Sequence, residues 1–353
     1  MTYLDANASE PLRPEARAAV MAALDITGNP ASVHQAGRAA RSLLEEARRS
    51  IAVRFGALAE GVVFTSGGTE ANTLAVRGFA PGRRVIMGAT EHEAVRMAAP
   101  NADILPVDGN GVVRLDRLRA MLAEGPALVC IMLANNETGT LQPVAEAAAL
   151  CRAAGSVLHV DAVQAREGAD LGALGAHSLA FSSHKLGGPK GAGALVLAEL
   201  DVPALLPGGG QERGRRGGTP ALPCIAGFAA AALSPRVGLL ALRRRVEAAG
   251  EQAGAIVMGG KERLDNTVCL VLPGVRSETQ VMVLDIAGVQ VSAGAACSSG
   301  RLGSSPVLVA MGHDDWAGSG IRVSLPWSAN VTDTDHFAAA YAEMAQRLRP
   351  RAA

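Results

Sequence analysis

Lysine is scarce in this sequence. Only three of its 33 basic residues are lysines, and two of these, Lys185 and Lys190, lie in the stretch "SSHKLGGPKGAG". Arginine cannot lose its proton near neutral pH, whereas a lysine removed from water can become an amine nucleophile. A lysine retained between a histidine and a run of glycines therefore indicates a chemical role.

Several protein classes are excluded by what the sequence does not contain. Its formal net charge is zero, and the densest basic cluster, Arg213, Arg215 and Arg216, lies among glycines without aromatic residues, which argues against a nucleic-acid partner. No apolar run reaches the length needed to span a membrane, and the first residues, "MTYLDANASE", do not resemble a secretory signal. We therefore expect a cytoplasmic protein with no membrane partner.

The five cysteines include no CxxC pair, which argues against both a disulfide framework and a structural metal site. Cys130, Cys151, Cys224 and Cys269 lie in or beside apolar stretches and are predicted to be small core residues. Cys297 differs, because it lies in "SAGAACSSG", whose small and polar residues are typical of an exposed loop. A reactive thiolate is accessible in such a loop.

The chain is long enough for two domains. Up to about residue 198, short apolar runs alternate with segments of helical periodicity, which predicts a mostly parallel sheet covered by helices. From Pro235 the pattern changes to a helix over 235–250, a strand over 266–273, a helix over 277–287 and further short strands before a closing helix. We predict an α/β fold with a large domain over residues 12–235 and a smaller α+β domain formed by residues 1–11 and 236–353.

Polar residues follow the apolar runs of the predicted sheet. In open α/β sheets, ligands bind beyond the carboxyl ends of the strands. Each of these residues alone also has an ordinary structural explanation as a cap, a turn or a packing residue. The set comprises the helix-opening "TSGGTEAN" with Gly68 and Thr69, and His92, Asn136, Asp161, Gln164, Ser182, His184 and Lys185.

One ligand accounts for this set, namely pyridoxal phosphate (PLP). It needs a lysine for a Schiff base, an acid at its ring nitrogen, donors for its phosphate and a group over its ring. A buried carboxylate keeps the ring nitrogen protonated, and this makes the ring an electron sink. These needs are met in turn by Lys185, by Asp161, by the turn at 66–69 with Ser182 and His184, and by His92.

Ten motifs follow one another in unbroken order from Tyr3 to about Leu325: "YLDANAS", "GNPASVHQAGRAAR", "FTSGGTEAN", "EHEAV", "NNETG", "HVDAVQ", "SSHKLGGPKG", "GGGQERGRRGGT", "SAGAACSSG" and "GIRVSL". This series resembles that of the cysteine desulfurases of the NifS and IscS type. The resemblance implies the fold of the aspartate aminotransferase type, fold type I of the PLP-dependent transferases, and a homodimer.

The resemblance also implies a role for each matching residue. Lys185 would hold PLP and act as the base, His92 would stack on the ring and carry protons, and Cys297 would accept sulfur. The other implied roles are Asp161 at the ring nitrogen, Asn136 and Gln164 at the phenolic oxygen, Gly68, Thr69, Ser182 and His184 at the phosphate, Thr219 at the phosphate of the neighbouring subunit, and Arg322 with Asn136 at the substrate carboxylate.

The implied reaction converts L-cysteine to L-alanine and leaves a persulfide on Cys297, for iron–sulfur cluster or other sulfur-containing product biosynthesis. A sulfur-acceptor or iron–sulfur scaffold protein would then be a partner. Two alternatives stay open: a selenocysteine lyase or another PLP-dependent lyase or aminotransferase of this fold, and a non-catalytic regulatory homologue. The presence of Lys185, Asp161 and Cys297 argues against the last of these.

Overall fold

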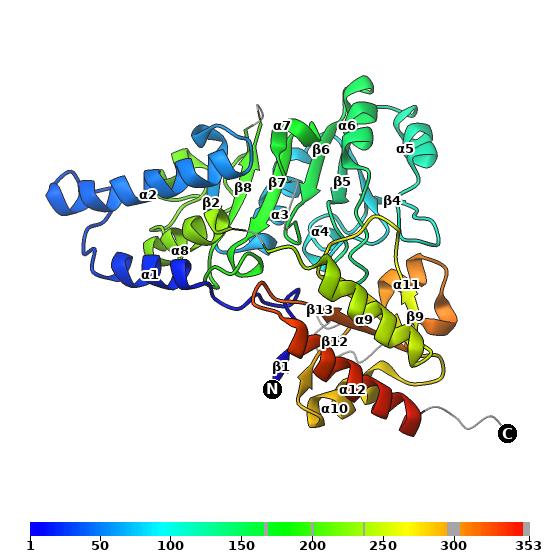
Figure 1. Ribbon diagram of the computed structural model, residues 1–353. Helices are drawn as coiled ribbons and strands as arrows, with labels where there is room; N and C mark the ends of the chain where they lie inside the picture. Colours follow the sequence, from blue (N-terminus) through cyan, green and yellow to red (C-terminus); the bar gives the residue numbers. More distant parts are fainter. Residues whose placement is uncertain (166–168, 199–200, 236, 295–303, 349–353) are drawn as a thin grey trace.

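The larger of the two main sheets has seven strands, in the spatial order β2, β8, β7, β6, β5, β3 and β4 (Figure 1). The computed structural model describes residues 1–165, 169–198, 201–235, 237–294 and 304–348. The strands are β2 (Val62–Thr65), β3 (Arg84–Gly88), β4 (Asp103–Leu105), β5 (Ala127–Met132), β6 (Val157–Asp161), β7 (Ser178–Ser182) and β8 (Gly193–Leu197).

The pairing of these strands confirms the predicted mostly parallel sheet. β4, β3, β5, β6 and β7 run parallel to one another, whereas β8 pairs antiparallel with both β7 and β2. Every residue of β5 is buried, as expected of a central strand covered on both faces. β5, β6 and β7 therefore end at the same edge of the sheet.

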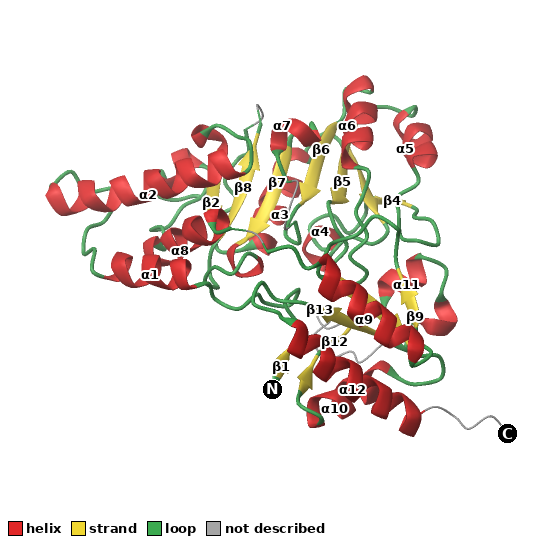
Figure 2. Ribbon diagram, viewed as in Figure 1, coloured by secondary structure: helices red, strands yellow, loops and turns green. Residues whose placement is uncertain are grey.

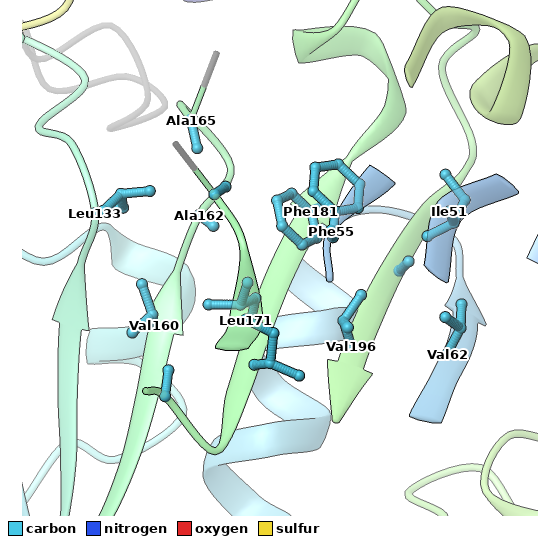
Figure 3. Close-up of a cluster of buried hydrophobic side chains, with 14 of the residues drawn as sticks. Ile51, Phe55, Val62, Leu133, Val160, Ala162, Ala165, Leu171, Phe181 and Val196 are labelled. Atoms are coloured by element: carbon cyan, nitrogen blue, oxygen red, sulfur yellow. The ribbon is translucent and has the colours of Figure 1, made fainter. Parts of the chain in front are cut away.

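Helices cover both faces of this sheet (Figure 2). On one face, Ile51 of α2 and neighbouring Phe55 pack on β7 and β8, and the rings of Phe55 and Phe181 stack with centroids 3.7 Å apart (Figure 3). On the other face, α3 contributes Leu74 and Phe79. The helices of this part are α1 (Pro14–Leu24), α2 (Gln35–Arg54), α3 (Gly68–Phe79), α4 (Glu93–Arg96), α5 (Leu115–Leu122), α6 (Val144–Ala153), α7 (Leu171–Leu174) and α8 (Leu222–Leu233).

A second, four-stranded antiparallel sheet has its own core. Its order is β12 (Ser292–Ala293), β13 (Gly320–Ser324), β10 (Thr267–Val271) and β9 (Ile256–Met258). β1 (Thr2–Tyr3) pairs with β11 (Val289–Gln290), and Leu4 packs in this second core. The first residues of the chain therefore pack with this second sheet. The division into a large domain over 12–235 and a smaller one over 1–11 and 236–353 stays a prediction. The helices here are α9 (Leu240–Gln252), α10 (Ser277–Ile286), α11 (Pro306–Ala310) and α12 (Val331–Leu348).

Two details differ from the sequence prediction. The helix predicted from residue 235 begins only at Leu240, because the N–H of Leu239 donates to the carboxylate of Asp265 (2.9 Å), and residues 237–239 stay outside the helix. Three of the four cysteines predicted for the core are buried, whereas Cys224 is half-buried at the edge of the core. In the described ranges, no helix combines the length and apolar character needed to cross a membrane.

The glycine-rich stretch "GGGQERGRRGGT" is fastened to the large sheet by one buried ion pair. Arg48 of α2 makes two hydrogen bonds to the carboxylate of Glu212, at 2.6 and 2.8 Å. The N–H of Phe64 donates to the same carboxylate at 2.8 Å. Glu212 and Arg213 have φ values of 49° and 59°, so two residues other than glycine adopt the left-handed backbone conformation here.

Candidate active site

A cavity of about 280 Å³ lies beyond the carboxyl ends of β5, β6 and β7. Open α/β sheets bind ligands at this position, beyond the carboxyl ends of their strands. Ten of the twelve residues that the sequence predicts for the site line the cavity. They are Gly68, Thr69, His92, Asn136, Asp161, Gln164, Ser182, His184, Lys185 and Arg322.

Lys185 lies in a short 3₁₀ turn that follows β7 directly. Its Nζ donates a hydrogen bond to the carbonyl oxygen of Asn7, from the N-terminal segment. The next residues reverse the chain: Gly187 has a φ of +84°, and the N–H of Gly188 donates to the carbonyl of Ser183 at 3.0 Å. The glycines beside the lysine therefore form the turn that presents its amine to the cavity.

Asp161 ends β6 and is 6 % exposed. Its Oδ1 accepts from the N–H of Val163 (2.9 Å) and its Oδ2 from the side-chain amide of Asn72 (2.8 Å). Burial raises the pKa of Asp161, while these hydrogen bonds and the nearby His92 and Lys185 oppose the rise. A cationic partner in the cavity would stabilise the ionised form of this buried carboxyl.

The carboxyl of Asp161 is supported by a chain of side chains that sequence reasoning missed. Oδ1 of Asn72, on α3, lies 2.9 Å from Nε2 of His159. Nδ1 of the same histidine lies 2.8 Å from the hydroxyl of Ser178. Burial lowers the pKa of His159 to about 3, so its ring is neutral. Because Asn72 uses its amide N–H on Asp161, its oxygen accepts from Nε2–H of His159, and Nδ1 then accepts from Ser178.

The N-terminus of α3 forms another wall of the cavity. Gly68 lies so close to the strand end that a Cβ there would meet Cγ2 of Val163 at 2.6 Å. The first N–H groups of a helix have no partner inside the helix and carry a partial positive charge, so they favour an anion. Thr69, Ser182 and His184 line the cavity with this helix start.

His184 contributes a neutral ring to this wall. Burial lowers its pKa to about 4, and the charges of Lys185 and Lys190 act in the same direction. Its Nδ1 is buried and has no hydrogen-bond partner among the described residues. A buried donor or acceptor without a partner favours binding of a polar group, because leaving it unsatisfied costs free energy.

His92 and Arg322 lie on other walls of the same cavity. Nδ1 of His92 accepts from the N–H of Ala94 at 3.1 Å and thereby caps α4. Arg322 of β13 is 2 % exposed and donates to the carbonyl of Asn136 (3.2 Å) and to the carboxylate of Asp5 (2.7 Å). Its Nε has no partner among the described residues.

The N-terminal segment supplies two residues that sequence reasoning did not assign, Asp5 and Asn7. Besides Lys185, the side-chain amide of Gln164 donates to the carbonyl of Asn7 at 3.0 Å. The amide of Asn7 donates in turn to the carbonyl of Asn136 (3.1 Å) and to the hydroxyl of Thr267 (2.9 Å). Asn7 therefore joins both sheets at the cavity. In the sequence, Asp5 and Asn7 are distinguished only by their place in the motif "YLDANAS".

One predicted residue, Thr219, does not line this cavity within one chain. Thr219 lines a separate hollow of about 180 Å³ together with Ser66 and Arg216. Arg216 pairs with Glu70 of α3 at 2.9 Å, which holds the glycine-rich stretch beside the start of that helix. Cys297 lies outside the described residues, so its role stays a prediction.

Comparison with known proteins agrees with this geometry. The sequence model of the family "Aminotransferase class-V" matches residues 2–337. The chain is 39 % identical to a cysteine desulfurase of Cereibacter sphaeroides, over 98 % of this chain and 96 % of the relative. The chain belongs to the class-V aminotransferases, in the family of the cysteine desulfurases. Other relatives of this family include an IscS-like cysteine desulfurase of Mycobacterium tuberculosis, which is 35 % identical over 95 % of this chain and 94 % of its own length.

Solved structures of the cysteine desulfurase family also match the fold. A NifS-like protein from Rickettsia africae superposes with a TM-score of 0.91 at 31 % identity, covering 98 % of this chain and 99 % of the other. This match, together with the seven-stranded sheet, confirms the predicted fold type I architecture and the resemblance to the NifS and IscS type. Enzymes of this family depend on PLP.

Proposed function

We propose that this chain is a PLP-dependent cysteine desulfurase that converts L-cysteine to L-alanine and carries the sulfur as a persulfide on Cys297. The observation that supports this most directly is the single cavity at the strand ends. It brings together an amine, a buried carboxyl, a helix N-terminus and a buried arginine, on Lys185, Asp161, α3 and Arg322. Family membership supports the same conclusion.

The residues of this cavity fit PLP. The amine of Lys185 would hold the cofactor covalently, and Asp161 would face its ring nitrogen. The free N–H groups at the start of α3, with the hydroxyls of Thr69 and Ser182, would bind the phosphate. The unpartnered Nδ1 of His184 provides a further polar contact. When bound, the cofactor withdraws electron density from the α-carbon of the substrate.

The chain's own residues would perform the remaining steps. Arg322 binds the substrate carboxylate, for which its planar guanidinium is suited. The Lys185 amine would take the α-proton, and His92 would carry protons at the other side of the cavity. The Cys297 thiolate attacks the substrate sulfur: an S–S bond forms, the C–S bond breaks, and its electron pair stays on the carbon that becomes the methyl group of alanine.

Assembly and location are part of the proposal. We expect a homodimer in which Thr219 reaches the phosphate site of the neighbouring subunit. The hollow that contains Thr219 is also lined by Ser66, which precedes the start of α3 by two residues. A sulfur-acceptor or iron–sulfur scaffold protein, and a cytoplasmic location, belong to the same proposal.

The experiment that tests this function measures sulfide and alanine from holoenzyme mixed with L-cysteine and a reductant. We expect equal amounts of both from the wild type and neither from Lys185→Ala or Cys297→Ser. Cys224→Ser is the matched control, because Cys224 is a half-buried free thiol that does not line the cavity. It should retain wild-type activity.

Two results would contradict the proposal. If Cys297→Ser formed as much sulfide as the wild type, the persulfide would have to be formed elsewhere. If the wild-type holoenzyme formed neither product from L-cysteine but released alanine from L-selenocysteine, the protein would be a selenocysteine lyase.

A further inference from the structure

The segment that carries Cys297 is flanked on both sides by contacts with one buried carboxyl group. Gly294 follows β12, and Ser305 precedes α11. The hydroxyl of Ser305 donates to Oε2 of Glu137 at 2.5 Å. A Cβ placed on Gly294 would lie only 2.4 Å from the same oxygen, so the backbone of Gly294 packs directly against it. Two points that are eleven residues apart in the sequence therefore meet at one atom.

The side chain of Glu137 has little freedom to move. It is 4 % exposed, and its residue is held in the turn after β5 because its N–H donates to Oδ1 of Asn135 at 3.0 Å. The hydroxyl of Ser305 also accepts from the N–H of Leu308 at 3.1 Å and so caps α11. Glu137 thus links a loop of the large sheet to the start of a helix in the smaller part.

This contact lies next to the candidate active site. A smaller cavity of about 60 Å³ is lined by His92, Asn136, Glu137 and Gly294, and the first two of these also line the larger cavity. Burial raises the pKa of Glu137, while the hydrogen bond from Ser305 and the charge of Arg322 oppose the rise. The residue is therefore close to the reacting groups without lining the cavity that contains Lys185.

We propose that Glu137 is a positioning residue for sulfur transfer: it holds Gly294 and Ser305, between which Cys297 lies in the sequence, and thereby positions the Cys297 thiolate for attack on the substrate sulfur. The proposal rests on the desulfurase function proposed above. Glu137 itself acts through the segment and makes no bond to substrate. The geometry also explains glycine at position 294, because its φ lies outside the left-handed region and only the missing Cβ is required there.

The first test compares Glu137→Ala with Glu137→Gln in the holoenzyme. Glu137→Ala should lower kcat for sulfide formation by roughly 10- to 100-fold, as expected when a reacting group is misplaced by about 1 Å. The KM for L-cysteine should not change, because Arg322 and Lys185 stay in place. Glu137→Gln retains a hydrogen-bonding group of the same size and should restore most of the rate.

A second pair of variants tests the contact itself. Gly294→Ala should slow sulfide formation in the wild-type background, since its Cβ overlaps Oε2 of Glu137. In the Glu137→Ala background the same change should add little, because the overlapping oxygen is gone. Additive losses in the double variant would overturn the proposal.

Two measurements separate this proposal from the proposed function. Exchange of the α-hydrogen of L-cysteine in D₂O, measured in Cys297→Ser, reports on Lys185 alone and should be unaffected by adding Glu137→Ala. Hydrogen–deuterium exchange of residues 304–310 requires no catalysis and should rise in Glu137→Ala but not in Glu137→Gln. Asp170→Ala, which removes a cap from the short helix α7, is the matched control and should leave this peptide unchanged.

The outcomes are distinct. If the wild type makes neither product while exchange at 304–310 rises in Glu137→Ala, the desulfurase function fails and the anchoring by Glu137 holds. If exchange at 304–310 is the same in Glu137→Ala and wild type, or if KM rises while kcat stays constant, the positioning role is wrong.

Discussion

The buried pair of Arg48 and Glu212 provides the sharpest stability prediction. The two side chains are 5 % and 2 % exposed and share two hydrogen bonds, and the N–H of Phe64 adds a third to the same carboxylate. Glu212→Ala would leave the Arg48 guanidinium buried, with the carbonyl of Val62 and the more exposed Glu45 as its other polar contacts. Removal of one partner from a buried ion pair costs about 3–5 kcal/mol.

The corresponding change in melting temperature can be estimated. For a domain of this size, 1 kcal/mol corresponds to roughly 2–4 °C, so Glu212→Ala should melt roughly 6–20 °C below the wild type in a circular-dichroism scan. Arg48→Met combined with Glu212→Ala should be clearly less destabilised than the sum of the two single variants, because neither charge is then left alone.

An exposed ion pair serves as the control. Arg347 and Glu343 on α12 are about 70 % exposed, and Glu343→Ala should not measurably change the melting temperature. If Glu212→Ala melts with the wild type, or if the double variant shows the full sum of the single losses, the assigned role of the pair is refuted.

Three further predictions concern the site. Gly68→Ala should weaken PLP binding to the apoenzyme by roughly 5- to 150-fold, which corresponds to an overpacking cost of about 1–3 kcal/mol. Gly67→Ala is the control and should leave PLP binding unchanged, because a Cβ has ordinary room at that position. Asn72→Ala removes a hydrogen bond that favours ionised Asp161, so the acidic limb of the activity profile should move to higher pH and activity at neutral pH should fall roughly tenfold; an unchanged profile would contradict this. The pKa of His159 falls from 6.5 to about 3 on folding. The stability that the neutral ring contributes to the folded state is therefore fully present above pH 6.5 and is lost as the pH falls toward 3. Urea unfolding should show about 2 kcal/mol less stability at pH 5 than at pH 6.5 from this residue, and His159→Gln should flatten that slope.

Much of the site could be predicted because of how parallel sheets are built. A buried strand is a continuous apolar run, so the polar residue that follows it is easily found, and Asp161 and Lys185 both stand in such positions. The sheet then brings these residues together whatever their separation in the sequence. This is why residues named one at a time from the sequence line one cavity.

The residues that were missed have no such local signal. His159 lies inside β6, where its alternation with Asp161 resembles ordinary strand packing, and Asn72 lies one turn into α3. Their roles appear only when the helix is packed on the sheet. Asp5 meets Arg322 across more than 300 residues, a contact that no periodicity can reveal. The roles of Thr219 and Cys297 stay predictions, because they depend on a second subunit and on residues outside those described.

The position of Asn7 has a consequence for the order of folding. Its carbonyl accepts from Lys185, its amide donates to Thr267, and its N–H donates to the hydroxyl of Ser324. A ribosome makes Asn7 long before Ser324, which follows more than 300 residues later in the sequence. The large sheet can form earlier from contacts that are closer in sequence. The surroundings of the Lys185 amine are therefore complete only after Ser324 has been synthesised. Chains that stop before this residue would have a formed sheet without a working site.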